Sequence, residues 1–138
     1  MNAEAKLLNT ATLENGPAVL IAEDEMLIRF ALSDCLADRG LRVFEAASAA
    51  EAIDVLEAEP EIDLVFTDIR MPGSLNGIDL ANWVHAHRPG LAVVLTSGDA
   101  RKAELAAKIT PEEPFIPKPY DMQTVADQIA DIALHKGK

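Results

Sequence analysis

The sequence predicts an α/β protein in which a parallel five-stranded sheet is covered by helices on both faces. Short apolar runs of strand length recur along the chain, and the segments between them carry apolar residues at helical spacing. Strands and helices that alternate in this way are typical of parallel sheets, because right-handed crossovers place helices on both faces.

The first unit is a strand, an acidic turn and a helix. Residues 18–22 form a continuous apolar run, as expected for a strand that is covered on both faces. The run ends at Glu23-Asp24-Glu25. Apolar residues then recur at helical spacing over 27–36, and Gly40 marks the end of this helix. The single cysteine, Cys35, falls among these apolar positions, so we interpret it as a small core residue.

The next two units follow the same plan. Residues 41–46 are predicted to form a strand, and Ser48 and Glu51 have capping-box spacing for a helix that Pro60 ends. Residues 62–67 are predicted to form the third strand, which stops at Asp68. A loop over 71–77 follows, and the third helix then extends from residue 78 to about residue 89.

The last part of the chain is less regular. Residues 91–96 are predicted to form the fourth strand. The segment 99–109 has an apolar face made mostly of alanine and is followed closely by Pro111 and Pro114, so we expect a short or mobile helix there. A brief fifth strand at Phe115-Ile116 and a helix over 122–133 complete the pattern.

Five such units close most naturally as a flavodoxin-like (βα)5 three-layer sandwich. The strand order 2-1-3-4-5 is implied by this fold class and is not itself visible in the pattern. That order places the ends of strands 1 and 3 side by side, where Glu23, Asp24 and Asp68 would converge. Ligands bind at this carboxyl edge in open α/β sheets.

Length and composition indicate one soluble domain. The chain has 138 residues, of which 49% are hydrophobic, enough for a single core. We expect residues 1–16 to be a tail and residues 17–138 to form the domain, with no room for an output domain.

No apolar run reaches membrane length and the start lacks the features of a secretory signal, so we expect a cytoplasmic protein that does not bind membranes. The net charge of -11 disfavours nucleic-acid binding.

The converging acids predict a cation site, and Mg²⁺ is the leading candidate because it prefers hard oxygen ligands. The alternative is that Glu23 and Asp24 only cap the following helix.

Thr96 ends strand 4, and Lys118 follows strand 5 between two prolines. A hydroxyl donor and a fixed ammonium beside the acids would suit a tetrahedral dianion bound over a metal. The alternative for Lys118 is a solvated loop lysine.

These residues resemble the receiver domain of bacterial two-component response regulators. The resemblance lies in Glu23-Asp24 after strand 1, Asp68-Ile69-Arg70-Met71-Pro72 after strand 3, Thr96 after strand 4 and Lys118-Pro119 after strand 5. It extends from about residue 18 to the last helix. All four motifs in order on five βα units form a specific combination.

The resemblance implies that Asp68 accepts a phosphoryl group from a sensor histidine kinase or a histidine phosphotransferase. Asp24, Asp68 and the backbone carbonyl of Arg70 would hold Mg²⁺, and Glu23 would act mainly through a bound water. The chain would then assist its own phosphorylation and dephosphorylation rather than act as an enzyme on another substrate.

The remaining family residues imply a switch. Lys118 would pair with the phosphoryl oxygens, and Thr96 would move to hydrogen-bond one of them. Phe115 matches an aromatic switch residue whose rotamer follows the threonine, although simple core packing explains it equally well. The signal would leave by contact with a downstream protein or by onward phosphotransfer, and the resemblance leaves open whether the chain acts as a monomer or a homodimer.

The sequence departs from the common pattern in two places. The glycine after the Met-Pro turn arrives one residue late, at Gly77, so we expect a longer loop after Asp68. Residues 96–98 and 114–119 resemble a stand-alone, largely alphaproteobacterial subgroup with a P-F-x-x-K-P ending and a reduced fourth helix, which would rearrange the usual switching face.

Three other functions compete with this interpretation. An aspartate-nucleophile phosphohydrolase would need a second acid where Arg70 stands. A flavodoxin would need a phosphate cradle after strand 1, where acids repel phosphate. A receiver-like interaction domain that is never phosphorylated would not need the complete site. His85 and His87 lie two positions apart on a helix and would point in different directions, which disfavours a metal site there.

Overall fold

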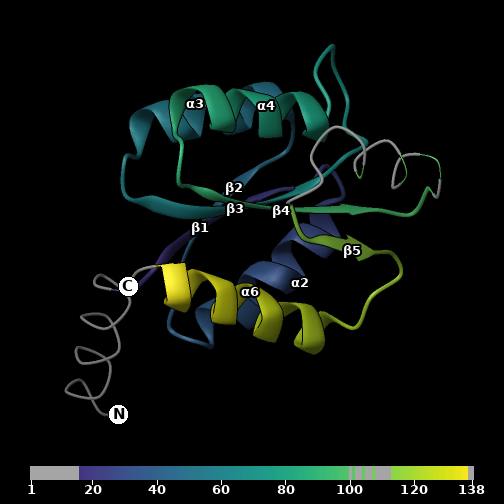
Figure 1. Ribbon diagram of the computed structural model, residues 1–138. Helices are drawn as coiled ribbons and strands as arrows, with labels where there is room; N and C mark the ends of the chain where they lie inside the picture. The colour runs from purple at the N-terminus through teal and green to yellow at the C-terminus, as the bar shows by residue number, and fades with distance from the viewer. Residues whose placement is uncertain (1–15, 100, 102–103, 105–106, 108–112, 137–138) are drawn as a thin grey trace.

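The computed structural model describes residues 16–99, 101, 104, 107 and 113–136 (Figure 1). The tail predicted before residue 16 and most of the segment 99–109 lie outside these residues. In chain order, the elements are β1 (Ala18–Ala22), α2 (Met26–Ala37), β2 (Arg42–Ala46), α3 (Ala49–Ala58), β3 (Ile62–Asp68), α4 (Gly77–His87), β4 (Ala92–Ser97), β5 (Phe115–Pro117) and α6 (Met122–Lys136).

The sheet has the predicted topology. Its five strands are all parallel and lie in the order β2-β1-β3-β4-β5. Helices α3 and α4 cover one face and α2 and α6 cover the other, which makes three layers (Figure 1). Strands β3 and β4 each continue one residue beyond the predicted end, because Asp68 pairs with Thr96 and Ser97 pairs with Pro117. The Ile69 amide also donates to the Thr96 carbonyl at 2.9 Å.

Two helices on the same face begin at the residues that their sequences favour. The Ser48 hydroxyl accepts a hydrogen bond from the Glu51 amide at 3.1 Å, which confirms the predicted start of α3. At α4, the Asn76 side chain accepts from the amides of Ile78 and Asp79, and the Asp79 carboxylate accepts from the Asn76 amide. This capping box starts α4 one residue earlier than predicted.

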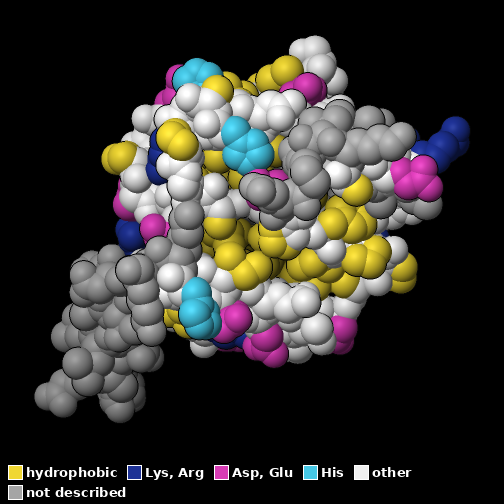
Figure 2. Space-filling model, in the orientation of Figure 1, with side chains coloured by type: hydrophobic (Ala, Val, Ile, Leu, Met, Phe, Trp, Pro, Cys, Tyr) yellow, Lys and Arg dark blue, Asp and Glu magenta, His cyan; other side chains and the backbone are white. Residues whose placement is uncertain are grey.

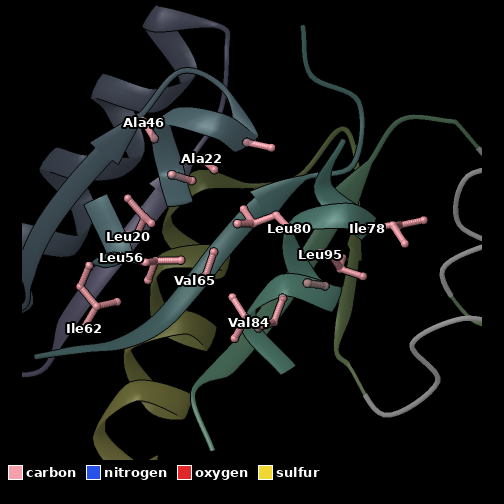
Figure 3. Packing of buried hydrophobic residues seen from close by; sticks show 14 of the residues in the cluster. Leu20, Ala22, Ala46, Leu56, Ile62, Val65, Ile78, Leu80, Val84 and Leu95 are labelled. Atoms are coloured by element: carbon pink, nitrogen blue, oxygen red, sulfur yellow. The ribbon is translucent and has the colours of Figure 1, made fainter. Parts of the chain in front are cut away.

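The sheet separates two hydrophobic clusters. One lies under α3 and α4 and includes Leu20, Val65, Leu80 and Val84, all buried (Figure 3). The other lies under α2 and α6. Cys35 packs against the second cluster, in agreement with its interpretation as a core residue. Burial of one large aliphatic side chain contributes roughly 1.5–3 kcal/mol, so the two clusters supply most of the force that holds the layers together.

Arg88 links the end of α3, the turn that follows it and the start of β3, at the amino edge of the sheet. Its guanidinium donates to the backbone carbonyls of Leu56, at 3.0 Å, and of Pro60 and Ile62, at 2.8 and 3.1 Å. These carbonyls lie at the end of α3, in the turn after it and at the start of β3. One side chain therefore provides donors for three backbone carbonyls where α3 ends and β3 begins.

Acidic side chains are exposed on the surface, as the net charge of -11 leads us to expect. On the face shown in Figure 2, Asp and Glu side chains are spread over several elements, and hydrophobic side chains gather near β5. No helix in the described part of the chain has the length and apolar character that crossing a membrane requires.

Candidate functional site

The carboxyl ends of β1, β3, β4 and β5 surround a cleft of about 870 Å³. All of its lining residues come from the ends of these strands or from the loops that follow them. They are Asp24, Glu25, Asp68, Arg70, Met71, Pro72, Ser97, Gly98, Asp99 and Lys118. The cleft is therefore at the edge where the sequence placed its candidate residues.

Asp68 stands at the end of β3 and is 6% exposed. Its Oδ2 atom accepts a hydrogen bond from Lys118 Nζ at 2.6 Å, and its Oδ1 atom accepts from the Arg70 amide at 3.1 Å. The backbone carbonyl of Asp68 accepts from the Thr67 hydroxyl at 2.9 Å. The carboxylate is thus held at the floor of the cleft by one cation and one backbone amide.

Glu23 directly follows β1 and is 1% exposed. Its Oε1 atom accepts from Lys118 Nζ at 3.0 Å, and its Oε2 atom accepts from the Glu25 amide at 3.1 Å. Burial raises the pKa of the Glu23 carboxyl, and although both hydrogen bonds oppose this effect, the pKa stays above its usual value. The nearby Asp68 charge adds to the effect of burial.

Lys118 bridges the two acids. Its backbone amide donates to the Ser97 carbonyl at 3.0 Å, which fixes the start of its side chain beside β4. Burial alone would lower the pKa of the Lys118 ammonium, but the hydrogen bonds to Asp68 and Glu23 outweigh it and raise the pKa above its usual value. The ammonium is therefore charged and fixed, and the solvated-lysine alternative is wrong.

The three predicted acids do converge. Glu23, Asp24 and Asp68 each offer a carboxylate oxygen, and these oxygens lie within 4.8 Å of one another. Glu25 is the N-cap residue of α2 and its side chain makes no capping hydrogen bond. Since neither Glu23 nor Asp24 occupies the cap position, helix capping does not account for this pair. The donor set consists of hard oxygen atoms, which fits a small divalent cation.

Thr96 lies next to Asp68 on the neighbouring strand and is fully buried. Within the described part of the chain, its Oγ1 atom has no hydrogen-bond partner. A buried hydroxyl without a partner is destabilising, so its presence at this position requires an explanation. An oxygen atom brought into the site would provide the missing partner.

Arg70 follows β3 and Phe115 lies in β5, as predicted, but the two side chains differ in burial. Arg70 is exposed and lines the cleft. Phe115 is partly buried, pairs with Leu95 in the ladder and packs against the hydrophobic cluster under α3 and α4. This packing accounts for Phe115 in the present conformation, and its role as a switch residue stays a prediction.

The structure explains why residue 77 is a glycine, which the sequence pattern did not indicate. A Cβ atom at residue 77 would lie 2.2 Å from the Asp68 carbonyl oxygen. The Gly77 amide donates to the Ile69 carbonyl at 2.8 Å. The start of α4 therefore packs directly on the backbone of the site, and only glycine fits there.

Sequence reasoning missed Tyr120. Its ring packs edge-on against Phe66, with 6.1 Å between the centroids, and its hydroxyl is buried without a partner among the described residues. Burial, followed by the nearby Glu23 charge, raises the pKa of Tyr120 to about 12. The only signal in the sequence was its place two residues after Lys118.

His85 and His87 of α4 contact different residues. His85 contacts Glu113, whereas His87 Nδ1 lies 2.9 Å from the Trp83 carbonyl oxygen and its ring stacks on Trp83. The two side chains thus have different partners, as their spacing predicted.

The chain is similar to known response regulator receiver domains over most of the described residues. A family model for the response regulator receiver domain matches residues 19–130. The chain is 30% identical over 133 residues to the sensor kinase CckA of Brucella abortus, which covers 94% of this chain and 14% of that protein. It is 35% identical over 117 residues to the transcriptional regulatory protein PdtaR of Mycobacterium tuberculosis, covering 84% of this chain and 55% of that protein. The chain therefore spans about half or less of the length of these relatives.

Solved structures give the same result. A response regulator receiver protein from Sinorhizobium medicae superposes with a TM-score of 0.78 at 26% identity, covering 89% of this chain and 98% of that chain. The receiver domain of NtrX from Brucella abortus gives a TM-score of 0.73 at 29% identity, covering 85% of this chain and 98% of that chain. Because the family model spans the fold from β1 into α6, this chain belongs to the response regulator receiver domains, which act in two-component phosphorelay signalling.

Proposed function

We propose that this chain accepts a phosphoryl group on Asp68 from the phosphohistidine of a sensor kinase or a histidine phosphotransferase. The observation that carries the proposal is the contact between Lys118 and Asp68 beside the partnerless hydroxyl of Thr96. A nucleophilic carboxylate, a fixed cation and a free hydroxyl donor then lie at one edge of the sheet.

In the proposed reaction, an oxygen of the Asp68 carboxylate attacks the phosphorus atom. The bond from phosphorus to the donor's imidazole nitrogen breaks as the new phosphorus–oxygen bond forms, which gives an acyl phosphate. The electron pair of the broken bond stays on that nitrogen, and the ring leaves as a neutral imidazole when the other ring nitrogen of the phosphohistidine carries a proton. The Lys118 ammonium balances negative charge on the phosphoryl oxygens, and Thr96 donates its hydroxyl proton in a hydrogen bond to one of them. A carboxylate has no proton to lose on attack, so the step needs no general base.

We assign the acid cluster to Mg²⁺, held by Asp24, Asp68 and the Arg70 carbonyl, with Glu23 acting through a water molecule. When bound, the ion would supply charge neutralisation for the phosphoryl group. Asp24→Asn should weaken Mg²⁺ binding and slow phosphorylation, whereas Asp54→Asn, on the exposed side of α3, should change neither. Calorimetric titration with Mg²⁺ measures the affinity directly. Equal affinity in both variants would remove Asp24 from the site.

The decisive experiment incubates the protein with a small phosphodonor and Mg²⁺ and measures its intact mass. We expect the mass of one phosphoryl group to be added to the wild-type protein and to Asp54→Asn, and not to Asp68→Asn. Full labelling of Asp68→Asn would show that another residue is the acceptor. A complete lack of labelling in every form would favour a receiver-like interaction domain.

We further propose that the phosphodonor protein docks on α2. This helix starts at the rim of the cleft, and its first turns expose Met26, Leu27 and Phe30, which are 55%, 81% and 47% exposed. A donor must bring its histidine to Asp68, so a helix that packs on this apolar surface would be in reach of the site. Leu27→Glu should slow transfer from a phosphorylated phosphotransferase but leave labelling by a small phosphodonor unchanged. Equal loss with both donors would instead indicate damage to the cleft.

A further inference from the structure

Arg29 connects the acidic turn to two strands. It lies on α2, and its side chain is 14% exposed. From Nη1 it donates to the Glu23 backbone carbonyl at 2.8 Å, and from Nε it donates to the Glu45 carboxylate at 2.9 Å. Glu45 belongs to β2 and Glu23 directly follows β1, so one guanidinium holds the ends of two neighbouring strands to the helix.

Arg29 completes the hydrogen bonding of Glu23. The Glu23 amide donates to the Ala46 carbonyl at 3.0 Å, and both oxygens of its carboxylate are occupied by Lys118 and the Glu25 amide. The backbone carbonyl is the remaining polar group. Because β1 has ended there, the sheet offers it no partner, and Arg29 supplies one.

The orientation of Asp24 depends on that carbonyl. Asp24 is exposed, and no described residue donates a hydrogen bond to its carboxylate, so the course of the backbone decides from which point and in which general direction this side chain extends. The Glu23–Asp24 peptide is planar, and its oxygen is held by Arg29. If the oxygen is released, the plane can rotate and carry the Asp24 side chain away from Glu23 and Asp68.

We infer that Arg29 is a positioning residue for the cation site: its hydrogen bond to the Glu23 carbonyl fixes the direction of the Asp24 carboxylate. This inference rests on the proposed function for its use of Mg²⁺, but the orientation of Asp24 is a property of the metal-free chain. Loss of Arg29 should therefore weaken Mg²⁺ binding by more than a general loss of stability explains.

The chain contains a matched control for Arg29. Directly after α2, Arg39 donates from Nη1 to the Cys35 carbonyl at 2.7 Å and from Nε to the Asp127 carboxylate at 2.8 Å. It thus makes the same two kinds of contact as Arg29, at the other end of the helix, and from Nη2 it also donates to the Gln123 carbonyl at 3.3 Å and to Gln123 Oε1 at 2.7 Å. Arg39→Met should therefore lose at least as much hydrogen bonding as Arg29→Met, without touching the acidic turn.

The experiment compares Arg29→Met and Arg39→Met with the wild-type protein. Calorimetric titration with Mg²⁺ alone should show about tenfold weaker binding for Arg29→Met, the lower limit for residues that orient metal ligands, and unchanged binding for Arg39→Met. Arg29→Lys should fall between the wild type and Arg29→Met because it keeps one donor. Phosphorylation of Arg29→Met should recover as Mg²⁺ is raised, since the defect lies in the affinity for the ion.

A second readout needs no ion. Amide hydrogen exchange at Asp24 and Glu25 in the metal-free proteins should be faster in Arg29→Met and unchanged in Arg39→Met. If Arg29→Met does not fold, Arg29→Lys and Arg39→Lys are compared by the same two measurements. Exchange at the acidic turn that is equal in the Arg29 and Arg39 variants would overturn the inference, as would equal Mg²⁺ affinity. Absence of Mg²⁺ binding in the wild type would overturn the proposed metal site, and exchange would then decide the role of Arg29.

Discussion

Lys118 Nζ lies 2.6 Å from Asp68 Oδ2 and 3.0 Å from Glu23 Oε1, so one ammonium donates to two buried acids from neighbouring strand ends. In a phosphorylated state the same ammonium would have to serve the phosphoryl oxygens as well. The geometry therefore links the resting stability of the site to its proposed chemistry, and substitution of Lys118 should affect both.

Lys118→Met should lower the free energy of unfolding by about 2 kcal/mol in the absence of metal, since two buried acids lose a charged hydrogen-bond donor. Mg²⁺ should then stabilise this variant more than the wild type, because the ion replaces the missing positive charge. Denaturant unfolding with and without Mg²⁺ measures both effects. A variant as stable as the wild type without metal would show that the two hydrogen bonds contribute little.

Thr96→Val should leave the unphosphorylated protein as stable as the wild type or slightly more stable. The valine has nearly the same shape, and the hydroxyl that it removes is buried without a partner. The same substitution should weaken the response to beryllofluoride, which mimics a phosphoryl group. Hydrogen exchange of residues 97–99 and 113–116 measures that response, with residues 41–59 as the internal reference. An unaltered response in Thr96→Val would exclude Thr96 from the switch.

Gly77→Ala should lower the free energy of unfolding by about 2 kcal/mol, because the added Cβ would overlap the Asp68 carbonyl oxygen and force α4 or the end of β3 to move. Gly98→Ala is the matched control: its Cβ would meet no atom closer than 3.7 Å, the Lys118 Cβ. Thermal unfolding compares the two. The prediction fails if the two variants lose the same stability.

Asp121→Ala should destabilise the start of α6 in a pH-dependent way. The Asp121 carboxylate accepts from the Thr124 amide at 2.9 Å and from the Thr124 hydroxyl at 2.8 Å, which lowers the pKa of Asp121 below its ordinary value of 3.8. An acid with a lowered pKa in the folded state contributes stability above the unfolded pKa and loses it as the pH falls through the folded pKa.

The melting temperatures of Asp121→Ala and the wild type should therefore differ most above pH 3.8 and converge below it. Asp121→Asn keeps a capping oxygen without the charge, so it should retain much of the stability at neutral pH and vary less with pH. A constant difference between Asp121→Ala and the wild type at every pH would show that the ionised cap is not the cause.

The strands and the site were largely predictable because both depend on features that are local in sequence. A buried parallel strand needs a continuous apolar run, so residues 18–22 and 62–67 indicated their own positions, and a polar residue that ends such a run marks the carboxyl edge. Glu23, Asp68 and Thr96 were found in this way.

The residues that were missed depend on contacts that leave no pattern. Arg29 holds a backbone carbonyl, which every residue has, and nothing in its own sequence position marks that partner. The need for glycine at residue 77 arises from the approach of α4 to the Asp68 carbonyl, a distance that only the folded chain defines. The predicted reduction of the helix over 99–109 lies mostly outside the described residues.

The hydrogen bonds from Arg88 to the carbonyls of Leu56, Pro60 and Ile62 lie at the edge of the sheet opposite the cleft. Arg88 bonds only to main-chain atoms, so it is insensitive to which side chains the loops at the far edge carry. Substitutions in the loops that follow β1 and β3 should therefore leave the contacts of Arg88 intact, because those contacts hold the layers together from the opposite edge of the sheet.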